Sequence, residues 1–594
     1  MSGRIGLAGS IGDIAEAVRA GRITARSVAS EAIARADAYE AVQPQVWIAR
    51  VPAADVLAAA AQVDRRIAAG EDLPLAGVPF AAKDNLDVAG MVTTAACPSA
   101  GYVAERSARV VELLVEAGAV LIGKTNLDQF ATGLVGTRSP YGACGCVFDK
   151  SFVSGGSSSG SAVAVAAGIV AFALGTDTAG SGRVPAAFNG LVGLKPTKGR
   201  WSTRGLLPAC RSLDCVSVFA HSLEDARAVD AVLTSFDEED IYSRDTGAFA
   251  APEKPRIGIP RKEDLHFLGD KDSAAFYAEA ARHAATLGEV VEVDISQLLD
   301  CAQLLYSGPW VAERTAALKD LLETNPKAIH PVVRGIVQSG LSKSAVDAFE
   351  GQYALKLYER AAQAIWRTVD VLLLPTTPTI YTKEQLLADP VALNSNLGLY
   401  TNFVNLLDMS ALAIPAGFRA NGTGFGVTLM GPAWADGFLL DFASAFQENQ
   451  TMSATPPLDE TPHKADIQLA VVGAHLHGMP LHFQLEERNA RLVRKAKTAP
   501  AYRLYAMETT PPKPALIHVG EADGSALELE IYEMDYASFG SFVEEVPAPL
   551  AIGTVTLDDG SEVKGFVAEP RAMEGSKDVT SFGGWRAYIA SLKG

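Results

Sequence analysis

Histidine is scarce in this sequence, and its scarcity restricts the catalytic chemistry that the chain can support. Only four of the nine histidines lie in the first 450 of 594 residues, and none of these four is in a Gly/Ser-rich motif. They are His221, His266, His283 and His330. A serine nucleophile there would need a different base, and Ser-Lys arrangements are a known alternative to Ser-His-Asp.

Positive charge and long apolar runs are also in short supply. The formal net charge of −18 argues against nucleic acid or an anionic membrane as a partner. No uninterrupted apolar run is long enough to span a bilayer, and the first ten residues lack a signal-peptide pattern. We therefore expect a cytoplasmic protein that acts on a small molecule.

The six cysteines are scattered and show no paired disulfide framework. They are Cys97, Cys144, Cys146, Cys210, Cys215 and Cys301. The pair Cys144 and Cys146 is spaced more tightly than zinc ligands usually are. We interpret the cysteines as small buried residues rather than as a zinc site.

Two Gly/Ser-rich segments are the most informative part of the chain. Residues 151–161 hold six serines and three glycines, and residues 175–181 end in Ala-Gly-Ser. Glycine lets the backbone approach a ligand closely, so such material is typical of a site rather than a core. The apolar run 162–174 between them predicts a buried helix that carries one cluster at each end.

A lysine at the end of an apolar strand is the candidate base. Residues 73–88 predict a strand that delivers Lys83 into the interior. Burial favours the neutral amine, which is the form that a general base needs.

These three segments together resemble the motifs of the amidase signature family. The carrying residues are Lys83 within Pro-Phe-Ala-Ala-Lys-Asp-Asn, the segment 155–161, and Asp-Thr-Ala-Gly-Ser at 177–181. The resemblance implies that Ser181 is the nucleophile and Lys83 the terminal base. Ser157 is then the bridging serine, held by a cis peptide bond after Gly156.

The resemblance also implies an oxyanion hole from backbone N–H groups of Thr178, Ala179 and Gly180. The family often has Gly-Gly before the nucleophile, where this chain has Ala179-Gly180. Alanine keeps its N–H group, so the hole stays possible.

Two other motifs compete with this interpretation. Residues 118–125 satisfy the Walker A pattern, but their variable positions form the expected strand itself, whereas a phosphate loop needs flexible backbone after a strand. Residues 156–160 match the nucleophile elbow of α/β-hydrolases, with Ser158 as nucleophile. That alternative lacks a paired histidine and leaves Ser181 and Lys83 unexplained.

Alternating helical periods and short apolar strands predict an α/β fold, with a central mixed sheet covered by helices on both sides. The family resemblance implies the same fold. Pro309-Trp310-Val311-Ala312-Glu313-Arg314, with Tyr306 ahead of it, further resembles the allophanate hydrolase group within the family. Tyr306 and Arg314 would share one helical face if the helix runs through Pro309. They are candidate substrate-binding residues, the alternative being a solvated surface helix.

The predicted elements change from mixed helices and strands to mainly strands after a Pro/Ser/Thr-rich stretch. We expect a catalytic domain at 1–450, a linker at 451–466 and a small β-rich α+β domain at 467–594. Five strands are predicted there, at 468–476, 515–519, 526–534, 552–557 and 563–569, with a hairpin turn at 558–560. The last domain resembles the C-terminal domain of allophanate hydrolases and, weakly, γ-glutamyl cyclotransferase-like barrels. His475 is its candidate acid/base or anion contact, the alternative being a hydrogen-bonded turn histidine.

The resemblance implies hydrolysis of the terminal amide of allophanate, giving ammonia and N-carboxycarbamate, with the second domain assisting decarboxylation. No metal and no organic cofactor are implied. A homodimer is implied, and the substrate would come from a urea carboxylase or a triazine pathway. Two alternatives remain open: another amide hydrolase of the family, or an amidotransferase A-type subunit that works with partner subunits and tRNA.

Overall fold

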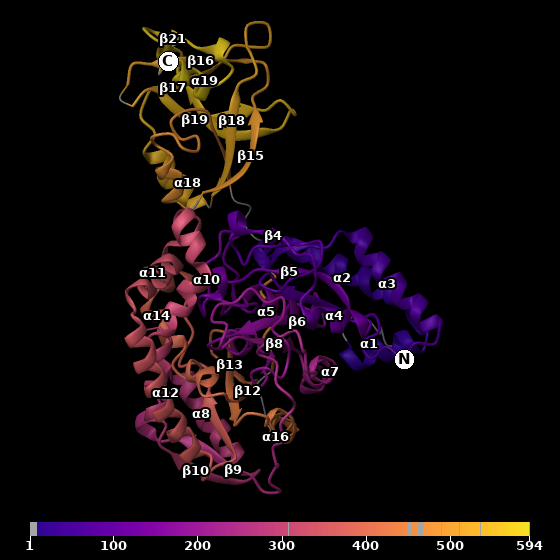
Figure 1. Cartoon of the computed structure of the whole chain (residues 1–594). Coiled ribbons are helices and arrows are strands. Elements are labelled where there is room, and N and C mark those ends of the chain that lie inside the picture. The colour runs from indigo at the N-terminus through magenta and orange to yellow at the C-terminus, as the bar shows by residue number, and fades with distance from the viewer. Residues whose placement is uncertain are drawn as a thin grey trace. The chain divides into compact units, whose positions relative to one another are not determined.

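The computed structural model describes residues 9–306, 308–448, 454–460, 467–488, 490–509, 511–534 and 536–592 (Figure 1). Two compact units make up the chain, Met1–Pro462 and His463–Gly594. The site residues expected from the sequence fall in both units, and all of them are described.

The first unit is built on an 11-stranded mixed sheet. In spatial order its strands are Trp47–Arg50 (β1), Val120–Thr125 (β5), Pro79–Lys83 (β2), Phe172–Asp177 (β6), Cys215–Ala220 (β8), Val192–Lys195 (β7), Ser410–Phe418 (β12), Gly424–Gly431 (β13), Val371–Pro375 (β11), Arg256–Pro260 (β9) and Glu289–Val293 (β10). β2 runs parallel to both of its neighbours, β5 and β6. From β6 to β11 each neighbouring pair is antiparallel. Val92–Thr93 (β3) and Tyr102–Val103 (β4) form a separate two-stranded ribbon.

Helices flank this sheet. The longer ones are Ile11–Arg19 (α1), Ala25–Glu40 (α2), Ala53–Ala68 (α3), Arg109–Glu116 (α4), Ser159–Ala166 (α5), Leu223–Leu233 (α7), Lys271–Ala284 (α8), Trp310–Thr324 (α10), Pro331–Ser339 (α11), Ala345–Ile365 (α12) and Asp436–Glu448 (α16). The shorter ones are Val184–Phe188 (α6), Ser296–Ala302 (α9), Lys383–Ala388 (α13), Ala392–Leu397 (α14) and Phe403–Leu406 (α15). Every residue of β2, β6, β8 and β12 is buried, which requires cover on both faces of the sheet. The predicted α/β fold is confirmed.

The expected helix over 162–174 is wrong in its length. α5 ends at Ala166, and β6 begins at Phe172. Gly168 has φ +67°, a left-handed conformation that favours glycine and ends the helix. Pairing with β2 then buries Phe172 against Phe80, with ring centroids 5.4 Å apart. The apolar run therefore serves two elements, and α5 and β6 together place the two Gly/Ser-rich segments.

The second unit contains two sheets. The five-stranded sheet has Arg491–Lys497 (β15), Glu528–Met534 (β18), Ile467–Val471 (β14), Glu562–Ala568 (β20) and Leu550–Thr556 (β19), in that order. The three-stranded sheet has Lys513–His518 (β17), Tyr502–Met507 (β16) and Lys577–Asp578 (β21). Its helices are Phe483–Glu486 (α17), Tyr536–Glu544 (α18) and Trp585–Ser591 (α19). The β-rich character and the β19–β20 hairpin were predicted correctly, whereas β15 and β16 were missed. The barrel likeness stays a prediction.

The expected linker lies partly outside the described residues, at 451–453 and 461–466. Its described part, residues 454–460, contacts the first unit, because the N–H of Asp459 donates to the carbonyl of Val147 at 2.7 Å. In the part of the chain that the structure describes, no helix is both long and apolar enough to cross a membrane.

Candidate active site

Lys83 ends β2 inside the first unit and has no exposed surface. Its Nζ donates to Ser157 Oγ at 2.7 Å and to Thr176 Oγ1 at 2.8 Å. Burial lowers the pKa of Lys83 to about 7, with nearby carboxylates acting in the opposite direction. The amine is therefore neutral in a large fraction of molecules near pH 7, as a general base requires.

Ser157 is hydrogen-bonded to Lys83 and follows Gly156, which has no space around it for a side chain. The Gly156–Ser157 peptide bond is cis, as the family resemblance implied. A Cβ on Gly156 would lie 2.2 Å from Asp128 Oδ2, so only glycine fits there. Asp128 accepts backbone N–H bonds from Val135 and Gly136 through the same oxygen. This carboxylate holds the loop around the bridging serine in place.

The loop that carries Ser181 is organised by Asp177, the last residue of β6. Arg183 pairs with Asp177 through two hydrogen bonds of 3.0 and 2.9 Å, and both side chains are fully buried. Asp177 Oδ1 also accepts the N–H of Gly180 at 2.8 Å. This donor is already engaged, which corrects the expected three-residue oxyanion hole. The N–H groups of Thr178 and Ala179 have no hydrogen-bond partner among the described residues and remain the candidate donors.

Ser181 is 2% exposed, and its Oγ lies 3.5 Å from the carbonyl of Gly133. Among the described residues, no hydrogen bond joins Ser181 to Ser157. The competing nucleophile, Ser158, is occupied instead. Its Oγ donates to the carbonyl of Thr176 at 3.1 Å and accepts the N–H of the same residue at 3.2 Å. That geometry makes Ser158 a support for α5 and β6, and it disfavours the nucleophile elbow.

Tyr306 and Arg314 meet, but not by sharing a helix. α10 begins at Trp310, after Pro309, so the condition that one helix runs through Pro309 is not met. The Arg314 guanidinium nevertheless lies over the Tyr306 ring, 5.2 Å from its centroid. Arg314 is 2% exposed and donates to Thr132 Oγ1 at 3.1 Å.

Among the described residues, Arg314 has no carboxylate within ion-pair distance, although the more distant Asp214 interacts with its charge. Within the part of the chain that the structure describes, no ion pair to Arg314 is formed, and its buried Nε has no hydrogen-bond partner. Thr132, which contacts this arginine, directly precedes Gly133, whose carbonyl is close to Ser181 Oγ. A buried guanidinium that lacks an ion-pair partner among the described residues and lies close to Ser181, the expected nucleophile, is suited to a carboxylate ligand.

Two further residues of the site were missed in the sequence. Asp214 accepts a 2.5 Å hydrogen bond from Thr178 Oγ1, and burial raises its pKa to about 6. Arg138 donates to the carbonyls of Thr132 and Pro390, at 3.0 and 2.6 Å. The available signal was a single charged residue within an otherwise apolar or Gly/Thr-rich stretch, at Leu213-Asp214-Cys215 and Gly136-Thr137-Arg138.

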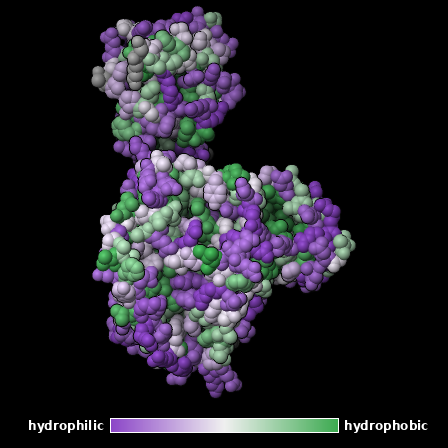
Figure 2. Space-filling model, viewed as in Figure 1, coloured by the Kyte–Doolittle hydropathy of each residue, from purple (hydrophilic) through white to green (hydrophobic). Residues whose placement is uncertain are grey.

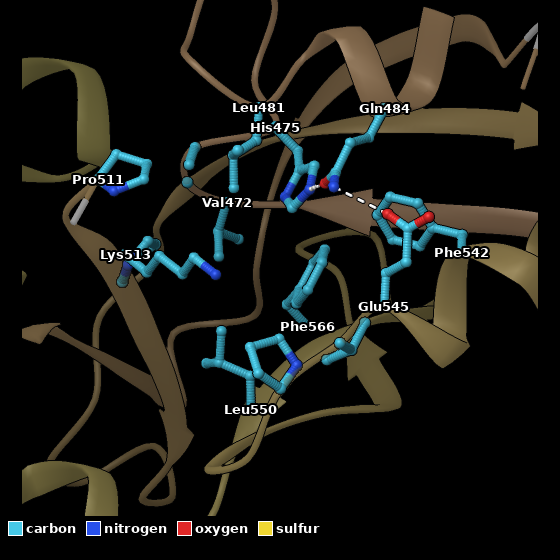
Figure 3. A pocket seen from close by; sticks show the side chains of 15 residues that line it. Val472, His475, Leu481, Gln484, Pro511, Lys513, Phe542, Glu545, Leu550 and Phe566 are labelled. Atoms are coloured by element: carbon cyan, nitrogen blue, oxygen red, sulfur yellow. Dashed lines mark hydrogen bonds between the residues drawn. The ribbon is translucent and has the colours of Figure 1, made fainter. Parts of the chain in front are cut away.

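His475 lies in the second unit beside a cavity of about 110 Å³ (Figure 3). The cavity is lined mainly by apolar groups, including Val472, Leu550 and Phe566, with Lys513 reaching into it. His475 Nε2 is 2.7 Å from Gln484 Oε1, and burial lowers the pKa of the ring. A partly open cavity lined by a histidine and a lysine is a candidate site for a small anion.

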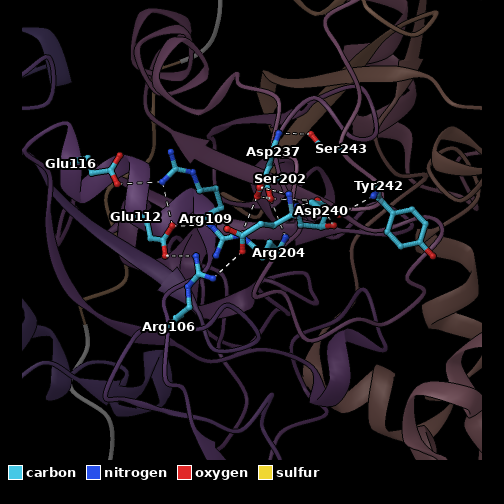
Figure 4. Close-up of polar contacts among 12 residues, drawn as sticks. Arg106, Arg109, Glu112, Glu116, Ser202, Arg204, Asp237, Asp240, Tyr242 and Ser243 are labelled. Carbon is cyan, nitrogen blue, oxygen red and sulfur yellow. Dashed lines mark hydrogen bonds and ion pairs between the residues drawn. The ribbon is translucent and has the colours of Figure 1, made fainter.

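A second hollow on the first unit is lined by two arginines, Arg106 and Arg204, both of which are paired with carboxylates (Figure 4). Arg204 pairs with Glu112 at 2.9 Å and with Asp237 at 3.1 Å, and Arg106 pairs with Glu239 at 2.9 Å. These charges already have partners, so this hollow is a weaker candidate than the cluster around Lys83.

Comparison with known proteins agrees with the geometry. A family model described as Amidase matches residues 31–440, and one described as Allophanate hydrolase C-terminal domain matches residues 467–590. The solved allophanate hydrolase of Kluyveromyces lactis has 42% sequence identity and a TM-score of 0.69, and the match covers 98% of this chain and 99% of that one.

Two curated relatives differ in how much of them is matched. Urea amidolyase of Saccharomyces cerevisiae is 45% identical over 549 residues, which is 88% of this chain but 30% of that protein. The chain therefore spans less than a third of the length of this relative. The A-type subunit of glutamyl-tRNA(Gln) amidotransferase from Deinococcus deserti is 36% identical over 475 residues, which is 73% of this chain and 95% of that protein. The chain belongs to the amidase family, and it carries an allophanate hydrolase C-terminal domain after its amidase domain.

Proposed function

We propose that this chain hydrolyses the terminal amide of allophanate, a urea with a carboxylate on one nitrogen. The buried guanidinium of Arg314 carries the proposal, because it lies near the nucleophile without a carboxylate partner among the described residues. A planar guanidinium binds a carboxylate through two parallel hydrogen bonds. Tyr306, which packs against Arg314, is suited to donate to the urea part of the same substrate.

The first reaction is an acyl transfer to Ser181. Neutral Lys83 accepts the Ser157 proton while Ser157 accepts the Ser181 proton, and Ser181 Oγ attacks the terminal carbonyl. The N–H groups of Thr178 and Ala179 stabilise the oxyanion. The amide C–N bond breaks, and the relay returns a proton to the departing nitrogen, which leaves as ammonia. Water then cleaves the acyl-enzyme ester and releases N-carboxycarbamate.

The second reaction is decarboxylation of N-carboxycarbamate, and we assign His475 and its cavity to it. The C–N bond to one carboxylate breaks, carbon dioxide leaves, and the electron pair stays on nitrogen, which takes up a proton. Lys513 lines the same cavity and supplies a positive charge for the remaining carboxylate. One water molecule needs a cavity of roughly 10–15 Å³. A volume of about 110 Å³ is therefore compatible with a ligand of this size.

We also propose that the chain forms a homodimer through α12. Its exposed apolar residues are Val346, Phe349, Tyr353 and Leu357, which are 62–71% exposed and spaced three or four residues apart along one face. Figure 2 shows hydrophobic groups among hydrophilic ones over the surface where Figure 1 places this helix. In an antiparallel pair centred on Tyr353, Phe349 meets Leu357 of the second copy, and Glu350 meets Lys356. The face is therefore complementary to itself in shape and charge.

A urea-carboxylating enzyme is the proposed source of the substrate. The matching relatives named urea amidolyase are more than three times as long as the segment matched in them, which supports a functional link with a second activity. We place the enzyme in the cytoplasm, because its six cysteines are all buried free thiols.

The test is ammonia release from allophanate by the purified protein, with Ser181→Ala as the inactive control. Release from allophanate at a much higher kcat/KM than from neutral amides is the expected result. Equal turnover of simple amides would instead make the chain a general amide hydrolase. Ammonia release only in the presence of glutamyl-tRNA partner subunits would make it one component of an amidotransferase.

A further inference from the structure

A chain of four hydrogen-bonded residues ends on His475 of the second unit, and Figure 3 shows its part from Glu545 through Gln484 to His475. Arg488 Nη2 donates to Glu545 Oε1 at 2.5 Å. Gln484 Nε2 donates to Glu545 Oε2 at 2.8 Å, and Gln484 Oε1 is 2.7 Å from His475 Nε2. Gln484 belongs to α17, whereas Glu545 directly follows α18, so the chain connects two helices to the cavity.

The donors and acceptors in this chain are determined by chemistry. A carboxylate paired with an arginine is ionised and can only accept hydrogen bonds. Gln484 must therefore turn its NH₂ group toward Glu545, which turns its carbonyl oxygen toward His475. That oxygen also only accepts, so the hydrogen between it and His475 belongs to Nε2. In a neutral imidazole the other nitrogen, Nδ1, is then an acceptor with a free lone pair.

The surroundings favour the neutral ring. Phe566 stacks on His475 with a centroid distance of 5.0 Å, and Phe542 meets it edge-on at 5.1 Å. Burial lowers the pKa of His475 and outweighs the hydrogen bond to Gln484, which raises it. Lys513 of β17 and His482 ahead of α17 act with burial, and Glu545 acts with Gln484. Among the described residues, no hydrogen bond to Nδ1 is formed.

We infer that Glu545 and Gln484 are positioning residues that fix His475 as the Nε2–H tautomer, so that Nδ1 accepts a hydrogen bond from the N–H of a small carboxylate ligand. The ammonium of Lys513 faces the carboxylate of that ligand. N-carboxycarbamate has this chemistry, since its single N–H lies between two carboxylates. The ligand part of the inference rests on the second reaction proposed above, whereas the tautomer part does not.

The test compares Glu545→Gln with Glu544→Gln, which removes the same charge from an exposed neighbour outside this hydrogen-bonded chain. In Glu545→Gln, Arg488 still donates to the oxygen of the new amide, whose NH₂ group then faces Gln484. Gln484 can turn its own NH₂ group toward His475, so the Nε2–H tautomer is no longer fixed. Nitrogen NMR of histidine-labelled full-length protein, assigned by the signals lost in His475→Gln, reads the tautomer directly. We expect Nε2–H in the wild type and in Glu544→Gln, and a mixture in Glu545→Gln.

Activity gives a second readout. Carbon dioxide release from the product of the first reaction should fall by about 10-fold or more in Glu545→Gln, as with other partners that orient a functional histidine. Release of the first ammonia should be unchanged, which shows that the protein is folded. Gln484→Leu should reproduce the loss if Glu545→Gln is unstable. A wild-type ring protonated on Nδ1 would overturn the inference. So would a tautomer that stays Nε2–H in Glu545→Gln as it does in Glu544→Gln. Undiminished carbon dioxide release in His475→Gln would instead refute the second reaction, with the tautomer still decided by NMR.

Discussion

Lys83 is the residue whose environment most strongly determines the chemistry. It has no exposed surface and donates to two hydroxyls. Its burial in the fold gives the amine a lower pKa than that of an exposed lysine. Because its pKa is lowered to about 7, the amine loses its proton as pH rises through neutrality. In the proposed relay, Ser157 therefore has a neutral base beside it in most molecules only above this range.

We predict that kcat/KM for allophanate rises with pH up to about 7 and then levels off. Asp214, with a pKa of about 6, is a second group that could produce an acid limb. In Asp214→Asn the limb should persist and move to lower pH, because the Asp214 carboxylate raises the pKa of Lys83. Lys83→Ala should lower turnover by about 10⁴-fold. A limb that disappears in Asp214→Asn would assign it to the carboxyl group instead.

Arg314 predicts selectivity for an anionic substrate. Losing the charge-assisted pair to a desolvated carboxylate costs on the order of 2–5 kcal/mol. Arg314→Ala should lower kcat/KM for allophanate accordingly and spare slow activity on neutral diamides. Arg314→Lys should recover part of the loss, since an ammonium lacks the planar fork.

The matched control for this experiment is Arg282→Ala, an arginine on α8 whose side chain is 71% exposed. It should leave both substrates unaffected. If Arg314→Ala lowers turnover of allophanate and of neutral amides by the same factor, the guanidinium only supports the fold.

At the scale of single residues, the sequence indicates the site where only a few residue types can perform the chemistry. A lysine that ends an apolar strand and serines set among glycines indicated the site, and the structure brings Lys83 and Ser157 into contact. Asp214 and Arg138 could not be predicted, because their roles arise from packing between segments far apart in the chain. Arg138, for example, reaches the carbonyl of Pro390, 252 residues away.

At the scale of elements, tertiary pairing overrode local preference. Apart from Gly168, no residue of the Ala/Val-rich run 162–174 is a helix breaker. Pairing with β2 nevertheless makes the end of this run part of a strand. Arg314 and Tyr306 meet across Pro309, which precedes α10, rather than within one helix. Periodicity alone predicts neither outcome, because the first depends on pairing with another strand and the second on where α10 begins.

The apolar face of α12 makes a prediction about assembly. Tyr353→Glu places a charge at the centre of the proposed two-fold contact, where it would face its own copy. We expect the wild type to sediment as a dimer and Tyr353→Glu as a monomer. Ala59→Glu adds the same charge to an exposed position of α3 and should stay dimeric. A wild-type monomer, or a dimer that persists in Tyr353→Glu, would contradict the contact through α12.

At the scale of the whole molecule, charge and division into units bear on the reaction. A net charge of −18 repels an anionic substrate at long range, so capture depends on the local cations of each site, Arg314 in one unit and Lys513 in the other. Screening by salt weakens this repulsion. Moderate salt should thus raise the association rate of allophanate. A neutral amide should show no such effect, and stopped-flow binding at two ionic strengths can compare them.

The division into two units predicts that the two reactions can be separated. Lys83, Ser157 and Ser181 all precede Pro462, and each of their contacts lies within the first unit. A chain truncated after Glu460 keeps the Asp459 contact to Val147 and should release the first ammonia at a rate close to that of the full chain. Carbon dioxide should then appear more slowly, because the cavity beside His475 is absent. Parallel assays of ammonia and carbon dioxide measure both steps, with Ser181→Ala in the truncated chain as the blank. If both products form at the full-length rates, the second unit takes no part in decarboxylation; if ammonia release is lost although the truncated chain is folded, the first site depends on the second unit.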